Sequence, residues 1–415
     1  MSQPIFIKGV LLNEQTTDIL IENNKFVGIG NNLSAPTNAF IIDGSHFAAF
    51  PTFANNHTHA AMTLFRGFGD DLPLDIWLNE WIWPKEKNLN PEIIYWGTRL
   101  ACLEMIKSGT TAFNNMYFFL EDETHAVNDS GIRAMLGCTH FGDADMMADL
   151  DAKLPEIPCE RISYSIAPHA IYTVSALGLK RCADYCKHHG LKFHIHMSET
   201  LKEVEDCIKA NGCRPYEYLD RLGILEQMGN DLIGAHSLHL DENEIALIGK
   251  YHCSVVHNPN SNLKLASGHE FYALEMKNAG VNVTLGTDGC SSSNNLDMLE
   301  ATKTMSLLQK GWRKDPTAMP CAEAFQIATV NGFKAMGIDA GRIEVGKLAD
   351  LMLVDLNNIA FIPNNNTLSN LIFSAHSDAI DTVICNGEVV MEHRHVKDEE
   401  EIISNARRVA KILLA

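Results

Sequence analysis

Hydrophobic and polar positions alternate over short stretches at both ends of the chain. Each stretch is bounded by Asn, Gly or Asp, which is typical of short strands joined by turns. Near the start these stretches are Ile5–Leu12, Asp18–Ile21, Lys25–Ile29 and Phe40–Ile42. Near the end they are Asp350–Asp355 and Thr382–Val390, the second with an Asn386-Gly387 hairpin signal. Neither set is long enough to bury a two-sheet core alone, so the pattern predicts one β-sandwich built from residues 1–50 and 346–395.

The middle of the chain, residues 51–345, alternates short apolar runs with longer amphipathic ones. Eight runs have the length and flanking residues of buried strands. They are Ala48–Phe53, Thr110–Asn114, Arg133–Gly137, Ile162–Ala167, Lys192–His196, Leu232–Ala235, Ser254–Val256 and Val281–Leu285. Helical patterns fall between them, at Glu92–Lys107, Ser175–His188, Glu242–Lys250, Glu270–Asn278 and Leu296–Leu308.

Eight strands, each followed by a helix, favour a parallel sheet closed into a (β/α)₈ TIM-type barrel. The alternative is an open, doubly wound sheet. No Gly-rich phosphate loop follows any of the strands, which weakens that alternative. Residues 396–415 are predicted to form a C-terminal helix. The fold class is therefore α/β, a barrel with a small sandwich made from both chain ends.

Composition and charge narrow the classes of partner. The chain of 415 residues is 46% hydrophobic and 20% charged, which is ordinary for a globular protein. Its net charge of −19 argues against nucleic acid or an anionic membrane as partner, because both are polyanions. The 11 cysteines lie among apolar neighbours without a Cys-x-x-Cys pair, as in a reducing compartment. With no signal-peptide pattern and no apolar run of membrane-spanning length, we expect a soluble, cytoplasmic protein.

Residues able to bind metal or move protons follow several predicted strands. In a barrel, chemistry gathers at the carboxyl ends of the strands. His57 and His59 follow the first strand, and their spacing places both imidazoles on one side of an extended chain. His196 ends the fifth strand, and His236 and Asp288 follow the sixth and eighth. Taken alone, His236 could cap a strand and Asp288 could be a turn residue. Their joint occurrence at one end of the barrel favours a site.

Three imidazoles and one carboxylate suit zinc, with iron(II) and manganese as open alternatives. We assign His57, His59, His196 and Asp288 as ligands of one divalent metal per subunit. A second metal is not favoured, because the fourth strand ends in Ile166-Ala-Pro-His169, without the lysine that often bridges two metals in such barrels.

The neighbouring polar groups have their own expected places. His236 is then free to hold a water molecule or its proton, and Glu199 lies close enough in sequence to His196 to deliver a proton. His194 is expected to face the surrounding helices as a core residue.

Several longer segments extend these strand ends into recognisable motifs. They are Asn56–Gly67, Asp70–Leu78, Trp83–Glu86, His196–Thr200, His257–Gly268, Leu285–Gly289 and Gly341–Leu351. On these segments the chain resembles the amidohydrolase superfamily, and within it the methylthioadenosine/S-adenosylhomocysteine deaminases, over nearly its whole length. The resemblance implies hydrolytic removal of the 6-amino group of an adenosine-type nucleoside, giving the inosine analogue and ammonia. Candidate substrates are methylthioadenosine, 5′-deoxyadenosine and adenosine, with S-adenosylhomocysteine as a further one.

The resemblance also implies roles for individual residues. His57, His59, His196 and Asp288 match the metal ligands of the family. Three residues match its proton-transfer groups. Glu199 matches the acid that protonates the purine ring, and His236 matches the histidine that positions or deprotonates the nucleophile. Asp288 matches the group that carries a proton to the leaving amine.

Three further residues are expected to contact the substrate. Glu86 matches the carboxylate that binds ribose hydroxyls, and His169 matches another nucleoside contact. Trp77 either packs against the base or fills the barrel rim.

One departure from the family bears on specificity. Members that act on S-adenosylhomocysteine hold its carboxylate with arginines in the loop after the third strand. Here no arginine lies between Arg133 and Arg161, and the loop is acidic. The acidic residues are Asp143, Asp145, Asp149 and Asp151. We therefore expect a preference for uncharged 5′ groups.

The expected partner is thus a small-molecule nucleoside, with no nucleic acid and no membrane, and we expect a homo-oligomer.

Two alternatives to this function stay open. The same scaffold serves deaminases and chlorohydrolases of other N-heterocycles such as guanine, pterins and triazines, although Trp83–Glu86 favours a nucleoside. A metal-free barrel acting as a binding protein is the other alternative, and the complete ligand set beside Glu199 argues against it. The zinc site of cytidine deaminases, with its Pro-Cys-x-x-Cys motif, is absent from the sequence.

Overall fold

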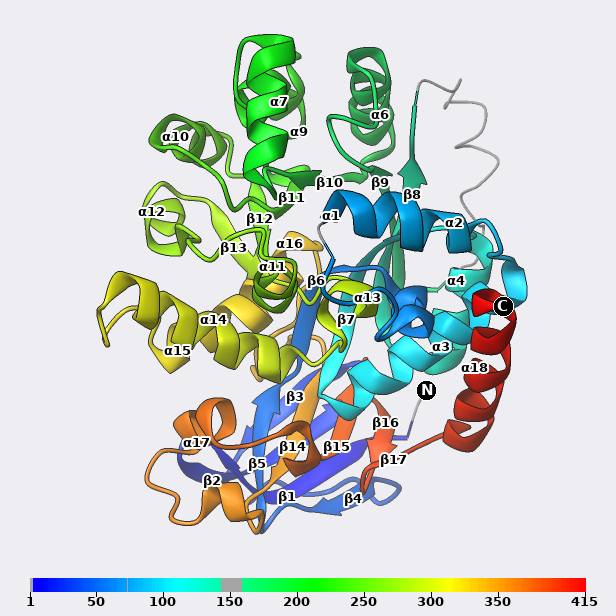
Figure 1. Ribbon diagram of the computed structural model, residues 1–415. Coiled ribbons are helices and arrows are strands. Elements are labelled where there is room, and N and C mark those ends of the chain that lie inside the picture. The colour runs from blue at the N-terminus through cyan, green and yellow to red at the C-terminus, as the bar shows by residue number, and fades with distance from the viewer. Residues whose placement is uncertain (1–2, 73, 143–158) are drawn as a thin grey trace.

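The computed structural model describes residues 3–72, 74–142 and 159–415. It contains an eight-stranded parallel sheet wrapped by helices and a separate nine-stranded sheet. Figure 1 shows the separate sheet below the barrel, with blue strands from the start of the chain beside orange strands from its end. No helix in the described ranges is both long and apolar enough to cross a bilayer.

The barrel strands follow one another in chain order, each parallel to the next. They are β6 (Phe53–Thr58), β7 (Thr110–Tyr117), β8 (Arg133–His140), β9 (Ile162–Pro168), β10 (Lys192–Met197), β11 (Leu232–His236), β12 (Ser254–His257) and β13 (Asn282–Leu285). Every described residue of β7, β11 and β12 is buried, as expected for strands covered on both sides. The predicted α/β barrel is confirmed.

Contacts between the first and last strands close the barrel. The Asn55 side chain donates to Thr287 Oγ1 at 2.7 Å, and its oxygen accepts from the Thr287 backbone N–H at 3.1 Å. The Asp288 N–H donates to the His57 carbonyl at 2.9 Å. These buried polar groups therefore have partners that only the closed barrel supplies.

The prediction of a single strand over Ala48–Phe53 is wrong. Ala48 belongs to β5 (Phe47–Pro51), which pairs with strands of the other sheet, whereas Phe53 begins the barrel strand β6. The apolar run therefore crosses from one sheet to the other. The polar residues of β6, Asn55 and Asn56, are fully buried through tertiary contacts, which the local pattern could not reveal.

The second sheet combines both ends of the chain. Its strands are β1 (Ile5–Leu12), β2 (Gln15–Glu22), β3 (Lys25–Gly30), β4 (Phe40–Asp43), β5, β14 (Leu351–Asp355), β15 (Ile380–Cys385), β16 (Glu388–Glu392) and β17 (His395–Val396). The sheet curls back on itself, because Phe26 of β3 exchanges backbone hydrogen bonds with Gly346 and Lys347, just before β14. Ile7, Phe26 and Leu353 pack in its core. The expected sandwich from both ends is present, while the exact domain boundaries stay a proposal.

Helices cover the barrel and form an arm over its carboxyl end (Figure 1). The covering helices are α3 (Pro91–Lys107), α4 (Leu120–Ser130), α6 (Ala176–His189), α7 (Leu201–Asn211), α8 (Pro215–Arg221), α9 (Ile224–Met228), α10 (Glu242–Lys250), α11 (Pro259–Lys264), α12 (Ala273–Asn278), α13 (Cys290–Ser293), α14 (Met298–Arg313), α15 (Cys321–Gln326), η4 (Ile327–Asn331) and α16 (Gly332–Ala335). The arm comprises η1 (Ala60–Phe65), α1 (Leu74–Ile76), the π-helical turn η2 (Trp77–Ile82) and α2 (Trp83–Glu86).

Local signals set many of the helix ends. Asn90 caps α3 by accepting from the Ile93 N–H, and Asp241 forms a capping box with Glu244 at the start of α10.

The predicted helix Glu270–Asn278 is shorter in the structure, since α12 begins at Ala273. The expected C-terminal helix is present as α18 (Glu399–Leu414), which packs along α3. The remaining short helices, η3 (Gly229–Asp231), η5 (Ile359–Phe361), α17 (Thr367–Phe373) and η6 (Ser377–Ala379), lie in connections.

A buried ion pair joins the barrel to the second sheet. Arg133, at the start of β8, donates through Nε and a terminal nitrogen to Asp350 at 3.1–3.2 Å, and also to Asn386 Oδ1 at 2.7 Å. The side chains of Arg133 and Asp350 are 3% and 0% exposed. Two buried charges that pair and share several hydrogen bonds fix the orientation of the two sheets, and removing one leaves the other uncompensated.

We therefore predict that Asp350→Ala lowers the free energy of unfolding by about 3–5 kcal/mol, because Arg133 stays buried without its partner. The matched control, Asp206→Ala, removes an exposed ion pair with Lys202 on α7 and should cost less than about 1 kcal/mol. Chemical denaturation of both variants measures the difference. Equal losses in the two variants would contradict the role given to Asp350.

Candidate active site

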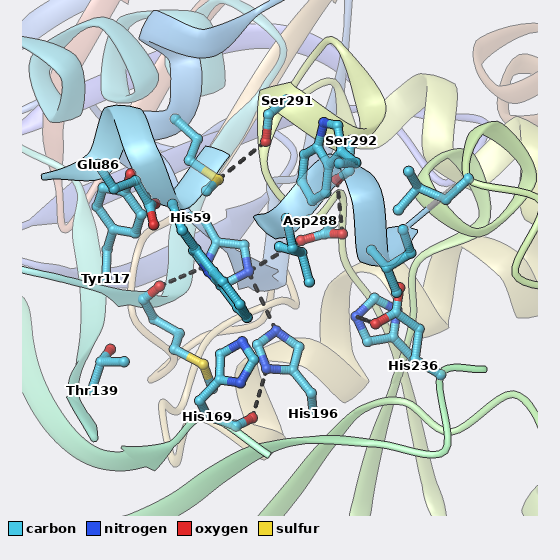
Figure 2. Close-up of a pocket in the computed structure, with 18 of the residues that line it drawn as sticks. His59, Glu86, Tyr117, Thr139, His169, His196, His236, Asp288, Ser291 and Ser292 are labelled. Atoms are coloured by element: carbon cyan, nitrogen blue, oxygen red, sulfur yellow. Dashed lines mark hydrogen bonds and ion pairs between the residues drawn. The ribbon is translucent and has the colours of Figure 1, made fainter. Parts of the chain in front are cut away.

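Four predicted ligands converge at the carboxyl end of the barrel. His57 lies near the end of β6 and His59 follows this strand; His196 lies near the end of β10, and Asp288 follows β13. Asp288 Oδ1 lies 3.4 Å from His57 Nε2 and 3.3 Å from His59 Nε2. The Nε2 atoms of His59 and His196 lie 3.3 Å apart. Figure 2 shows His59, His196 and Asp288 directed toward one another.

The opposite nitrogen of each imidazole is held by the surrounding protein. His59 Nδ1 lies 2.6 Å from the Met116 carbonyl, and His196 Nδ1 lies 2.7 Å from the His169 carbonyl. A backbone carbonyl only accepts, so each of these two rings carries its proton on Nδ1 and leaves the Nε2 lone pair directed inward. Such hydrogen bonds are the usual support of histidine metal ligands.

His57 is held by another histidine, His194, and the predicted orientation of His194 is wrong. His194 does not face the helices; its Nε2 lies 3.0 Å from His57 Nδ1, and both rings are fully buried. Residues two apart on a strand share a face, so His194 lies on the same side of β10 as His196. The pairing directs His57 Nε2 to the centre of the site.

The arrangement fits a divalent metal. His57 Nε2 is buried and has no hydrogen-bond partner, although it borders the other ligand atoms. Burial lowers the pKa of His57 to about 4, so the ring is neutral and its lone pair needs an acceptor such as a metal. Burial alone would raise the pKa of Asp288, but the adjoining rings of His57 and His59 hold it well below the ordinary value. Burial also lowers the pKa of His196 well below its ordinary value, whereas at His59 the lowering by burial is outweighed by the neighbouring Asp288 and the pKa is raised. Three imidazoles and an ionised carboxylate form a donor set typical of zinc-type ions.

Two serines orient the carboxylate of Asp288. Ser261 Oγ and Ser292 Oγ donate to Asp288 Oδ2 at 2.6 and 2.8 Å, which leaves Oδ1 facing the histidines. Asp288 has a left-handed backbone, with φ of 64°, which non-glycine residues seldom adopt. Such strain concentrates at functional sites.

Glu199 and His236 lie together beside the ligand set. Glu199 Oε2 is 3.8 Å from His236 Nε2, and the two residues are 8% and 1% exposed. Burial, with the charge of Asp288 adding to it, raises the pKa of Glu199 to about 8, so this carboxyl keeps its proton to higher pH than an exposed glutamate. Side-chain amides of Asn258 and Asn262 lie 3.3 and 3.1 Å from His236 Nδ1 and fix the ring.

The three predicted substrate contacts line the same pocket. Glu86 accepts a hydrogen bond from Tyr117 Oη at 2.7 Å, and both are labelled in Figure 2. His169 stacks on Phe141 with ring centroids 4.7 Å apart. Trp77 is 5% exposed and forms part of the pocket wall on the arm. The structure thus brings every predicted site residue except the fully buried His57 to the pocket surface, and His57 lies directly behind it.

Several residues of the site were not predicted. Tyr117, His194, Ser261 and Ser292 hold predicted residues in place but carry little signal of their own. Tyr117 could have been found, since β7 runs to Tyr117 rather than to Asn114, and strand ends are where site residues gather. The two serines are recognisable only once the chain brings their helices to Asp288.

Comparisons with known proteins agree with this geometry. The model of the amidohydrolase family matches residues 48–390. The chain is 47% identical to a 5′-deoxyadenosine deaminase of Methanospirillum hungatei, over 90% of this chain and 85% of that protein. It is 44% identical to 5-methylthioadenosine/S-adenosylhomocysteine deaminase 1 of Archaeoglobus fulgidus, over 95% of each. Among solved structures, an adenosine deaminase from Xanthomonas campestris with bound zinc has a TM-score of 0.91 and 33% identity, covering 99% of this chain and 98% of that one.

The ligand assignment predicts what happens when one imidazole is removed. His57→Ala should lose most of its bound metal and lower the rate of any metal-dependent reaction by at least about 10²-fold, since three ligands remain around a buried gap. His188→Ala, at an exposed position on α6, is the control and should keep both. Elemental analysis of the purified proteins gives the metal content. Full metal content in His57→Ala would remove His57 from the ligand set.

Proposed function

The chain belongs to the amidohydrolase family, and on that basis we propose that it hydrolytically deaminates an adenosine-type nucleoside at C6, releasing ammonia and the inosine analogue. The observation that carries the proposal is that one pocket is lined by three of the ligands, His59, His196 and Asp288, together with Glu199 and Glu86. Deamination of a nucleoside needs these three functions together: activation of water, delivery of a proton and a hold on the sugar.

His57, His59, His196 and Asp288 would hold one divalent metal per subunit, with zinc favoured by the three imidazoles and one carboxylate. The zinc-containing relative of similar fold supports this choice, and iron(II) and manganese remain alternatives. When bound, such an ion supplies Lewis acidity, which makes water nucleophilic near neutral pH.

The protein's own groups move the protons of the reaction. Glu199 donates a proton to a ring nitrogen of the purine as water adds to C6. His236, fixed by Asn258 and Asn262, holds the attacking water and accepts its proton. Asp288 takes the second proton of the water from the hydroxyl group now on C6 and passes it to the departing amine. The proton that His236 accepted returns to Glu199, 3.8 Å away, which restores the acid. One C–O bond forms, the C6–N bond breaks, and the water supplies the oxygen of the product and hydrogen of the ammonia.

The remaining pocket residues would bind the nucleoside. Glu86 accepts hydrogen bonds from ribose hydroxyls, and Tyr117 holds it in place through the 2.7 Å hydrogen bond. His169, fixed by Thr173 Oγ1 at 3.0 Å from its Nδ1, contacts the nucleoside through the rest of the ring. Trp77 packs against the base. Holding the sugar and base at fixed points keeps C6 beside Glu199 and His236, which raises the fraction of productive encounters.

The lining of the pocket favours an uncharged 5′ group. The described lining contains no lysine or arginine and is largely aliphatic and aromatic. The apolar residues include Leu74, Leu78, Trp83, Phe118, Phe141 and Leu265. A charged amino-acid tail would lose its hydration there without gaining a cationic partner. The acidic residues Asp143, Asp145, Asp149 and Asp151 lie outside the described residues.

The finer expectations about the whole protein remain proposals. We infer a cytoplasmic homo-oligomer that acts on free nucleosides. We also infer that it binds neither nucleic acid nor membrane, because its net charge is −19. The charge repels both kinds of polyanion.

Glu199→Gln tests the acid. The amide has the shape of the carboxyl group but cannot supply its proton, so we expect kcat to fall by about 10²–10⁴-fold while the metal content stays at the wild-type level. Ammonia release and elemental analysis give the two quantities. Wild-type turnover in this variant would remove Glu199 from the mechanism.

A substrate panel tests the 5′ preference. The kcat/KM values for methylthioadenosine and 5′-deoxyadenosine should exceed that for S-adenosylhomocysteine by at least about tenfold, which corresponds to about 1.4 kcal/mol of differential stabilisation. Adenosine and guanine complete the panel, and guanine should not react. A higher value for S-adenosylhomocysteine would show that the apolar lining does not set specificity.

A further inference from the structure

Glu203 is a buried carboxyl group behind the pocket, in the first turn of α7. It is 8% exposed and is not among the residues that line the pocket. Its Oε1 accepts from the Ser198 N–H and its Oε2 accepts from the Glu199 N–H, both at 2.8 Å. Both oxygens are thus committed to the backbone of the segment that carries Glu199.

The sequence explains how Glu203 reaches this segment. Thr200 caps α7 by accepting from the Glu203 N–H at 3.1 Å, which places Glu203 in the third helical position. A glutamate there ordinarily bonds back to the N–H of the capping residue. Here the side chain extends further back, to the two residues before the cap. It thereby stabilises Ser198 in a left-handed conformation, with φ of 49°, that costs of order 1–3 kcal/mol.

The turn that carries Glu199 is also joined to the turn that carries His236. The Ser237 N–H donates to the Met197 carbonyl at 2.8 Å, and the N–H groups of Leu238 and His239 donate to the Ser198 carbonyl at 3.1 and 3.0 Å. His236 itself has a left-handed backbone, with φ of 68°. The turn that carries Glu199 and the turn that carries His236 therefore support each other, and Glu203 holds the first of them.

We propose that Glu203 is a positioning residue that fixes the backbone of Glu199 so that its carboxyl group points at the purine ring. The inference rests on the proposed deamination, in which Glu199 delivers the proton. The carboxyl group is needed because both of its oxygens accept. Glutamine would offer one oxygen and turn its NH₂ group toward the second backbone N–H, which leaves that donor unpaired. A shift of about 1 Å in a proton donor is enough to lower a rate about 10²-fold.

A double-mutant cycle separates positioning from a general structural role. The variants are Glu199→Gln, Glu203→Gln and the two combined. Glu203→Gln should lower kcat about 10- to 100-fold with little change in KM and with the metal content unchanged. In the Glu199→Gln background, adding Glu203→Gln should lower kcat no further, because there is no longer a proton donor to position.

Two additional variants keep the test decisive. Asp297→Asn is the control for exchanging a carboxyl group at a helix start for an amide, since Asp297 accepts through Oδ1 from the backbone N–H groups of Leu299 and Glu300 at the start of α14, outside the pocket lining. It should leave kcat unchanged. If Glu203→Gln does not fold, Glu203→Asp replaces it in the cycle, because aspartate keeps the carboxyl group but is too short to reach both N–H groups.

The possible outcomes are distinguishable. Independent, multiplicative losses of kcat in the double variant would overturn the positioning role while leaving the proposed function intact. A wild-type kcat in the Glu203 variant would overturn it as well. Wild-type turnover in Glu199→Gln would instead refute the proton donor, and with it the reaction that the inference rests on.

Discussion

The closing contact between β6 and β13 is the constraint on which the site depends. The hydrogen bond from the Asp288 N–H to the His57 carbonyl joins the first and last strands of the barrel at the level of the ligands. The exchange of hydrogen bonds between Asn55 and Thr287 fixes their register. Residues more than 200 positions apart in the chain are thereby held with their donor atoms 3.3–3.4 Å apart. None of these residues would form a site alone, and the closing of the barrel brings their ligand atoms together.

Around this point the protein removes the freedom of each reactive group. The imidazoles have their Nδ1 atoms engaged, Asp288 is held by two hydroxyl groups, and the turns of Glu199 and His236 are bonded to each other. Left-handed backbone at Ser198, His236 and Asp288 shows that local strain is tolerated there. The many surrounding hydrogen bonds and the buried barrel core offset that strain. A rigid arrangement of this kind spares the reaction the cost of orienting its groups.

The sequence predicted the barrel, the sheet from both chain ends and the residues that converge in the pocket. The two sheets and the metal-binding and proton-transfer residues follow from local patterns: buried strands, and polar residues where the strands end. The roles of Glu86, His169 and Trp77 were predicted only from the resemblance to the amidohydrolase superfamily. The error at Ala48–Phe53 arose because a short apolar run does not show which sheet its two halves join. The prediction for His194 was wrong because residues two apart on a strand share a face, so His194 points to the same side of β10 as His196. Ser261 and Ser292 could not be assigned, because their contacts with Asp288 exist only after α11 and α13 have packed. Glu203 was not assigned, because a glutamate at the third position of a helix ordinarily bonds to the capping residue and not to the two residues before it.

The central claim is that this pocket adds water to C6 of an adenosine-type nucleoside and expels the amine. Turnover of 5′-deoxyadenosine in oxygen-18-labelled water tests it most directly, with the nucleoside product analysed by mass spectrometry and the ammonia quantified. The account predicts one labelled oxygen at C6 of an intact nucleoside and one ammonia for each product molecule. Free adenine, or an unlabelled nucleoside product, would contradict it.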